Sequence, residues 1–328
     1  FPEDVVKASQ HINTTITDNP RRWDLRDVPM VTIDGEDAKD LDDAVSGRKL
    51  DNGNYELGVH IADVSHYVVS QKAIDREAYK RGTSVYLVDR VIPMLPEVLS
   101  NGICSLNAGE DRYAMTCMME IDTHGKVVKY RIQPSIIHVN RRCSYKEIYK
   151  ALTEDIIPDD LVPLMPMIHN LSDIAKTLND MRRRRGALDF DFPEYKVLLD
   201  TDGTPLRIVR RDRTLAERLI EECMLIANET VATHLKNTNR TSVYRIHETP
   251  SEEKMSMYQK VLNYLGQDIR LHLDELEPRM FQHILDAVKG TDVEQVAQIM
   301  TLRSMQQAKY SIDNVGHFGL ASKCYTHF

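Results

Sequence analysis

The stretch VTIDGEDAKDLDDAV, residues 31–45, places six carboxylates within ten residues: Asp34, Glu36, Asp37, Asp40, Asp42 and Asp43. Acidic runs are usually solvated loops, because like charges repel one another. This run, however, begins inside a strand-like segment and is interrupted by apolar residues such as Leu41 and Val45. A carboxylate on buried backbone needs a compensating charge or stays protonated. Two interpretations remain, a solvated acidic loop and a loop that holds a cation.

The spacing of the acids can be tested against known metal motifs. An EF-hand needs glycine at loop position six, which neither Asp34 nor Asp37 as first ligand provides. A helical DDxxD patch conflicts with Gly35 and with the strand that precedes it. What remains is a loop leaving a strand, on which the acids six to nine residues apart converge. These are Asp34, Asp40, Asp42 and Asp43.

Hard oxygen ligands without cysteine favour Mg²⁺ or Mn²⁺ over zinc. Two such ions about 3.5–4 Å apart suit in-line displacement at phosphorus. The residues themselves therefore favour metal-assisted phosphoryl hydrolysis. The nearby segment HIADVSHYV offers His60, Asp63 and His66, but its histidines are six residues apart and do not match a helical zinc motif. We expect structural hydrogen bonds there.

The pattern outside the carboxylate stretch predicts one α+β domain. From residue 31 to 142 strands and turns dominate, including YELGVHIADV and a hairpin around THGK. From residue 144 helix formers take over, interrupted by the strand pair DFPEYKVLLD and PLRIVR. Helices are predicted over RTLAERLIEECMLIANETVATHL, over SEEKMSMYQKVLNYLG behind a serine cap, and through residues 293–311. We expect a single large domain with a mixed or antiparallel sheet packed by helices.

Composition limits the class of protein. The 328 residues are 42% hydrophobic and 28% charged, with a net charge of −8. There is neither a membrane-spanning run nor a signal-peptide pattern. The five scattered cysteines form no CxxC pair, which suits a reducing cytoplasm. We expect a cytoplasmic monomer.

The blocks TIDGEDAKDLDDAV and HIADVSHYV, followed by RGALDFDFPE, ERLIEECMLIANETVA, YRIHETPSEEK and QAKYSIDNVGHFGLASKCYTHF, closely resemble the catalytic (RNB) domain of the ribonuclease II/ribonuclease R family. The residues of these motifs are more similar to those of bacterial ribonuclease R than to those of ribonuclease II. The resemblance covers residues 22–328 and leaves residues 1–21 as a connecting arm. It implies a Mg²⁺-dependent hydrolytic exoribonuclease that digests single-stranded RNA from the 3′ end and releases nucleoside 5′-monophosphates. The alternative is a catalytically inactive RNA-binding or regulatory member of the same fold.

Residue by residue, the resemblance makes Asp34, Asp40, Asp42 and Asp43 the metal-binding and catalytic carboxylates. Glu36 and Asp37 are then solvated bystanders. The resemblance further implies RNA contacts outside the loop. Tyr86 and Phe190 match two aromatics that clamp the 3′-terminal base, although Phe192 is close enough to take the place of Phe190. Glu221 matches a glutamate that contacts the RNA end.

Two further features follow from the resemblance. The four arginines at residues 182–185 either contact RNA phosphates or complete a helix C-terminus. The chain ends at CYTHF, where the family continues with a segment containing SPIRRYPD, so we expect a fragment of a longer enzyme. The flanking RNA-binding OB-folds of the family are likewise expected but absent.

Overall fold

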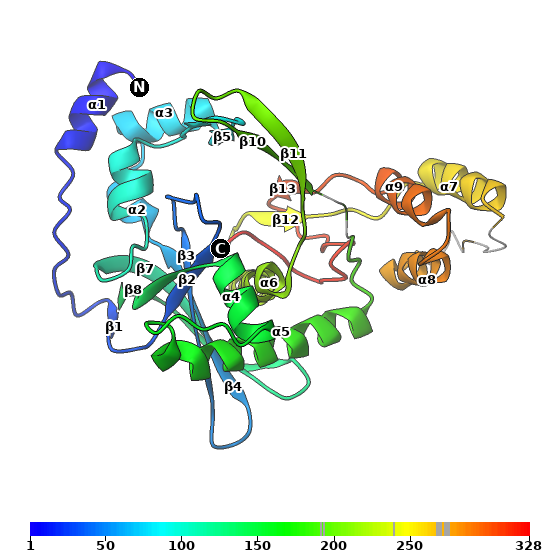
Figure 1. Cartoon of the computed structure of the whole chain (residues 1–328), viewed down its shortest axis with the longest axis horizontal. Helices are drawn as coiled ribbons and strands as arrows, with labels where there is room; N and C mark the ends of the chain where they lie inside the picture. Colours follow the sequence, from blue (N-terminus) through cyan, green and yellow to red (C-terminus); the bar gives the residue numbers. More distant parts are fainter. Residues whose placement is uncertain (191, 193, 239, 267–270, 272–275) are drawn as a thin grey trace. The chain divides into compact units, whose positions relative to one another are not determined.

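The structure is a computed structural model that describes residues 1–190, 192, 194–238, 240–266, 271 and 276–328 (Figure 1). The chain divides into two compact units. Unit 1 comprises residues 1–123, 127–175 and 192–224, and unit 2 comprises residues 124–126, 176–191 and 225–328. No helix in the described part of the chain is long and apolar enough to cross a membrane.

Unit 1 is built on a seven-stranded sheet with the order β1-β8-β7-β4-β3-β2-β9. The five strands from β8 to β2 pair antiparallel, whereas β1 pairs parallel with β8 and β9 pairs parallel with β2. The mixed sheet confirms the predicted fold class. The strands are β1 (Trp23–Leu25), β2 (Val31–Asp34), β3 (Asp43–Lys49), β4 (Tyr55–Ala62), β7 (Asp111–Ile121), β8 (Val127–His138) and β9 (Arg141–Ser144).

The predicted hairpins place the carboxylate stretch next to the centre of this sheet. β3 and β4 are joined by a tight turn in which Gly53 has a φ of +85°, a conformation that glycine adopts without strain. The β4 residues Leu57 and Val59 are fully buried. The β-branched residues of YELGVHIADV after the turn DNGN are what predict this strand from the sequence.

Helices cover the sheet. α5 packs closely against β3, as the space at Gly47 shows: a Cβ on this glycine would lie 2.8 Å from Leu171 Cδ2. The arm at residues 1–21 contains α1, whose Val5 is buried in a cluster with Ile74 and Leu99. The helices within unit 1 are α1 (Glu3–Gln10), α2 (Val64–Tyr67), α3 (Ala73–Arg81), the π-helical segment η1 (Val98–Ile103), α4 (Tyr145–Thr153) and the 3₁₀ segment η2 (Val162–Leu164). The chain passes between the units within α5 (Met165–Arg185) and α6 (Leu215–Asn237).

Two small antiparallel hairpins complete unit 1. One consists of β5 (Val85–Tyr86) and β6 (Val91–Ile92), and the other of β10 (Glu194–Leu199) and β11 (Pro205–Arg211), drawn in light green in Figure 1. The second confirms the strand pair predicted for this region.

In its described residues, unit 2 has three short helices around one apolar cluster. They are α7 (Glu252–Tyr264), α8 (Pro278–Val288) and α9 (Glu294–Ser304). Tyr258 and Phe281 stack in the cluster, and Ser251 caps α7 as predicted. The helix predicted through residue 311 was wrong after Ser304: the backbone becomes extended at Met305, and β13 (Lys309–Ser311) pairs with β12 (Tyr244–Ile246).

Candidate active site

The carboxylate loop, which we define as Asp34–Asp43, links the end of β2 to the start of β3. One side of the loop is fastened by Arg142 on β9, the strand that pairs with β2. Its Nη2 donates to the backbone carbonyls of Gly35 (3.3 Å), Glu36 (2.9 Å) and Ala38 (2.7 Å). Arg142 therefore shapes the loop by binding its backbone carbonyls.

The other side of the loop is held by a buried serine. Ser105 Oγ donates to the Lys39 carbonyl (2.8 Å) and accepts from the Leu41 amide (3.1 Å). Leu41 is 2% exposed and its carbonyl accepts from the Leu106 amide (2.8 Å). Asp40 and Asp42 flank this buried residue, so the burial of Leu41 fixes the backbone between them.

The carboxylates raise one another's affinity for protons. Burial, followed by the charges of Asp34 and Asp42, raises the pKa of Asp43 to about 7. Asp42 is exposed, yet the surrounding protein desolvates its carboxyl enough that burial, ahead of the charges of Asp40 and Asp34, raises its pKa to about 6. The mutual effects place the four acids within electrostatic reach of one another.

Two tyrosines border the carboxylates. Tyr86 Oη donates to Asp40 Oδ2 at 2.5 Å, and this bond, ahead of burial, raises the pKa of Tyr86 to about 12. Burial first, and then the charges of Asp34 and Asp43, raises the pKa of Tyr145, the first residue of α4.

The donor set fits a hard divalent cation, although the geometry is not that of a closed metal site. Within the described residues, no three Asp, Glu, His or Cys side chains are gathered so that they could hold one ion. Burial first, and the neighbouring carboxylates second, raise the pKa values of Asp42 and Asp43, and a bound cation would offset the negative charge that both causes disfavour. Asp40 would have to give up its hydrogen bond from Tyr86 to direct both carboxylate oxygens at a cation.

The two remaining acids of the loop differ from each other. Glu36 is exposed and lies 3.6 Å from Lys146 Nζ. Asp37 Oδ2 accepts from Lys196 Nζ of β10 at 2.5 Å, which lowers the pKa of Asp37. The interpretation of Asp37 as a bystander missed this ion pair, because Lys196 is 159 residues away in sequence.

Among the other residues that the resemblance implies, Tyr86 contacts the loop through Asp40. Tyr86 is 65% exposed in unit 1, whereas Phe190 packs against the apolar cluster of unit 2. Their pairing as a clamp stays a prediction. Glu221 on α6 accepts from Arg213, while its neighbour Glu222 is only 2% exposed. A buried glutamate was not singled out from the sequence, since the helical pattern does not separate the two positions.

Arginines of the run at residues 182–185 make structural contacts within unit 2. Arg182 is 5% exposed, and Arg185 forms a bidentate ion pair with Glu229 (2.6 and 2.9 Å). Arg184 donates to the His124 carbonyl (3.0 Å). These contacts favour the structural alternative for the run.

The segment HIADVSHYV is likewise structural, as predicted. His60 is fully buried between Ser46 Oγ (3.1 Å from Nε2) and Thr116 Oγ1 (2.8 Å from Nδ1). Asp63 pairs with Arg22 at 2.6 Å and accepts from the His66 amide. All five cysteines are free and buried.

Comparison with known proteins identifies the family. The RNB domain matches residues 22–328 of the chain. The chain belongs to the RNB family. Ribonuclease R of Thermotoga maritima is 47% identical over 332 residues, which cover 100% of this chain and 46% of that protein.

Solved structures agree with this RNB assignment. Mycoplasma genitalium RNase R in complex with ribose-methylated single-stranded RNA has a TM-score of 0.93 and 31% identity, over 98% of this chain and 51% of that one. The complex of the same protein with double-stranded RNA has a TM-score of 0.96 and 30% identity, over 100% and 59%. The chain thus spans about half the length of the relatives it matches.

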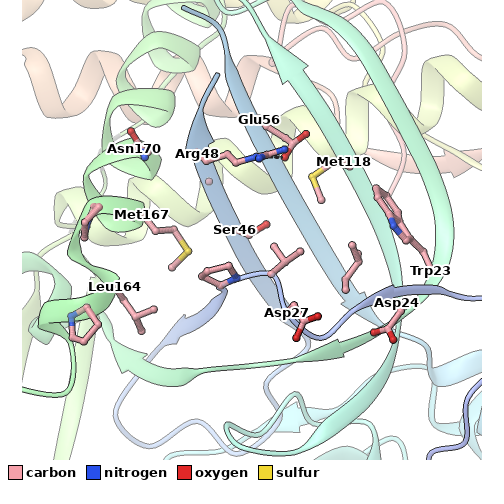
Figure 2. A pocket seen from close by; sticks show the side chains of 16 residues that line it. Trp23, Asp24, Asp27, Ser46, Arg48, Glu56, Met118, Leu164, Met167 and Asn170 are labelled. Carbon is pink, nitrogen blue, oxygen red and sulfur yellow. Dashed lines mark hydrogen bonds and ion pairs between the residues drawn. The ribbon is translucent and has the colours of Figure 1, made fainter. Parts of the chain in front are cut away.

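The RNB chain also has a cavity of about 670 Å³ in unit 1 that none of the four aspartates lines (Figure 2). Trp23, Met118 and Met167 give it apolar walls, with Ser46 and Arg48 as polar groups. Ser46 follows Asp43 by three residues on β3, so it lies on the opposite face of the sheet. The cavity is therefore separate from the carboxylate loop.

Proposed function

We propose that this protein is a metal-dependent exoribonuclease that removes nucleotides from the 3′ end of single-stranded RNA. The observation that supports this most strongly is the desolvated carboxylate loop, in which Asp42 and Asp43 have raised pKa values, within a chain of the RNB family. A relative in that family is named Ribonuclease R, and one solved RNase R is in complex with single-stranded RNA.

The four aspartates Asp34, Asp40, Asp42 and Asp43 would hold Mg²⁺, with Mn²⁺ as a substitute. When bound, one or two such ions activate water and offset negative charge at the phosphorus. Water then replaces the O3′ of the penultimate nucleotide at the terminal phosphate. The released nucleotide keeps that phosphate as its 5′-monophosphate, and the shortened RNA gains a 3′-hydroxyl.

The chain's own groups organise this site. Arg142 and Ser105 hold the loop backbone, so the carboxylates need to move little when cations enter. The exposed ring of Tyr86 is available to stack on the terminal base, with Phe190 as the proposed opposing ring and Glu221 as a contact to the RNA end. Stacking tolerates any base, as a general RNA-degrading enzyme requires.

The further expectations from sequence belong to this proposal. The protein acts as a cytoplasmic monomer, which its five reduced, buried thiols suit. Flanking OB-type domains would add binding contacts to single-stranded RNA.

The test is RNA hydrolysis by the protein as its gene encodes it. A 5′-labelled single-stranded RNA should shorten stepwise with Mg²⁺, release nucleoside 5′-monophosphates and stop with EDTA. Asp42→Asn should lower the rate by a factor of about 10² or more, because it removes a charge at the reacting phosphate. RNA binding should remain.

Glu36→Gln is the matched control, since it neutralises an exposed acid of the same loop. It should keep the parent rate. Binding of RNA without release of mononucleotides would instead assign the chain to the inactive, RNA-binding members of the fold.

A further inference from the structure

The β10–β11 hairpin has two chemically different faces. Paired residues of an antiparallel hairpin share a face, and alternate residues along a strand do the same. The register pairs Glu194 with Arg211, Lys196 with Val209 and Leu198 with Arg207. These pairs form one face, which we call the basic face because it contains Lys196, Arg207 and Arg211. The other face contains Tyr195 paired with Arg210 and Val197 paired with Ile208.

The basic face is the one turned toward the carboxylate loop. Lys196 forms its ion pair with Asp37 in that loop. Arg211 lies 3.8 Å from Glu217, near the start of α6. After burial, the charges of Asp34 and Asp43 of the loop and those of Glu217 and Arg211 all act on the pKa of Tyr145, so Arg211 and the two aspartates lie near the same tyrosine.

The cations on this face are accessible and weakly held. The Lys196 side chain is 55% exposed and that of Asp37 is 80% exposed. Exposed ion pairs contribute only about 0–1 kcal/mol, so a phosphate can replace the carboxylate at little cost. Arg211 is 49% exposed and its contact with Glu217 is long. Arg207 is also exposed.

We propose that the basic face of the β10–β11 hairpin binds backbone phosphates of single-stranded RNA on its way to the carboxylate loop, with Lys196 exchanging Asp37 for a phosphate. This inference rests on the proposed function. The chain has a net charge of −8, and the loop repels a polyanion until cations are bound. A row of cations beside the loop overcomes that repulsion. Arg207 and Arg211 are four residues apart on one strand, about 13 Å, so the row follows the backbone over more than one phosphate.

The test is the salt dependence of RNA binding, measured in EDTA so that hydrolysis does not interfere. The probe is a fluorescent single-stranded 12-nucleotide RNA, and the readout is anisotropy between 50 and 300 mM KCl. Each of Lys196→Gln and Arg207→Gln should lower the slope of log affinity against log salt by about 0.7, the value for one phosphate contact on a single strand. Their double variant should lower it by about 1.4.

Arg210→Gln is the matched control, because it removes the same charge from the opposite face of the same strand. It should leave the slope unchanged. An equal effect of Arg210→Gln, or no effect of the basic-face variants, would overturn the proposal. In the same assay Asp37→Asn should tighten binding about two- to fivefold, since Lys196 no longer has to leave a carboxylate. Weaker binding by Asp37→Asn would contradict the exchange.

The outcome can be separated from that of the proposed function. If the parent protein hydrolyses RNA while the binding series is flat, only the hairpin proposal fails. If the parent binds RNA with the expected slopes but releases no mononucleotides, only the exoribonuclease proposal fails.

Discussion

Unit 1 has two polar clusters on opposite faces of neighbouring strands. In one cluster carboxylates of like charge are gathered, and in the other neutral donors and acceptors satisfy one another. On one face, Asp43 belongs to a group of carboxylates that can only accept hydrogen bonds when ionised. On the other face, His60 pairs across the ladder with Ala44, the residue after Asp43, and belongs to a neutral chain of donors and acceptors.

The proton positions in the neutral chain follow from its end. Ser135 Oγ donates to the Ala114 carbonyl (3.2 Å), so it accepts from Thr116 Oγ1 (2.6 Å). Thr116 then accepts from His60 Nδ1, and His60 Nε2 accepts from Ser46. Every member is satisfied with the histidine neutral, and burial lowers the pKa of His60 to about 3.

The contrast separates a polar network that stabilises the fold from the carboxylate cluster for which we propose a function. A satisfied buried network stabilises the fold and has no remaining capacity for a ligand. A cluster of like charges opposes folding and gains from binding a cation. The comparison therefore predicts that substitutions in the two clusters change stability in opposite directions.

The largest effect is expected at Asp43. Its pKa is raised from 3.8 to about 7, so the folded state holds this proton more tightly than the unfolded chain. Stability is lost as the pH rises between these values, by about 1.4 kcal/mol for each unit. Asp43→Asn removes this loss, and its free energy of unfolding in EDTA at pH 8 should exceed that of the parent by up to about 4 kcal/mol.

Urea unfolding from pH 4 to 8 measures this difference, which should widen with pH. Asp51→Asn, on the exposed turn between β3 and β4, is the control. Added Mg²⁺ should narrow the gap, because the ion stabilises only the folded parent. A variant no more stable than the parent in EDTA would contradict the account of the loop.

The second effect has the opposite sign. His60→Phe leaves the Ser46 hydroxyl without its acceptor and Thr116 without the donor from Nδ1, although Thr116 keeps its bond to Ser135, and should lower the free energy of unfolding at pH 7 by about 2–4 kcal/mol. Because the folded pKa of His60 lies below 6.5, the parent loses stability as the pH falls below 6.5 toward 3, by about 1.4 kcal/mol per unit. The variant lacks this loss, so the gap should close in acid.

The same urea series provides the measurement for His60. His169→Phe, at an exposed position on α5, should keep the pH dependence of the parent. If the gap between His60→Phe and the parent stays constant from pH 7 to 5, the histidine is not held neutral in the fold.

Local patterns were enough to predict the strands of the sheet and the hairpin around THGK, whereas the assignment of the loop aspartates as metal ligands stays a prediction. Contacts between segments distant in sequence could not be predicted from these patterns. Asp37 looked solvated because its partner Lys196 comes from a hairpin 159 residues later, and Tyr86 gave no sign that its hydroxyl would meet Asp40. The error after Ser304 has a related cause, since the pairing of β13 with β12 joins segments about 65 residues apart and overrides helix propensity.

The smallest effect sharpens the role of Tyr86, which offers the site both a ring and a hydroxyl. Tyr86→Phe keeps the ring but frees Asp40 from its hydrogen bond. A freed carboxylate joins the other ligands more easily, so the Mg²⁺ concentration for half-maximal hydrolysis should fall about two- to fivefold, the size of one exposed hydrogen bond. The shortest RNA left undigested should be unchanged, because stacking needs only the ring.

Tyr86→Ala should lower the Mg²⁺ requirement similarly but lengthen that limit product. Magnesium titrations and denaturing gels on the same samples separate the two roles: a longer limit product from Tyr86→Phe would mean that the hydroxyl, and not the ring, positions the RNA end.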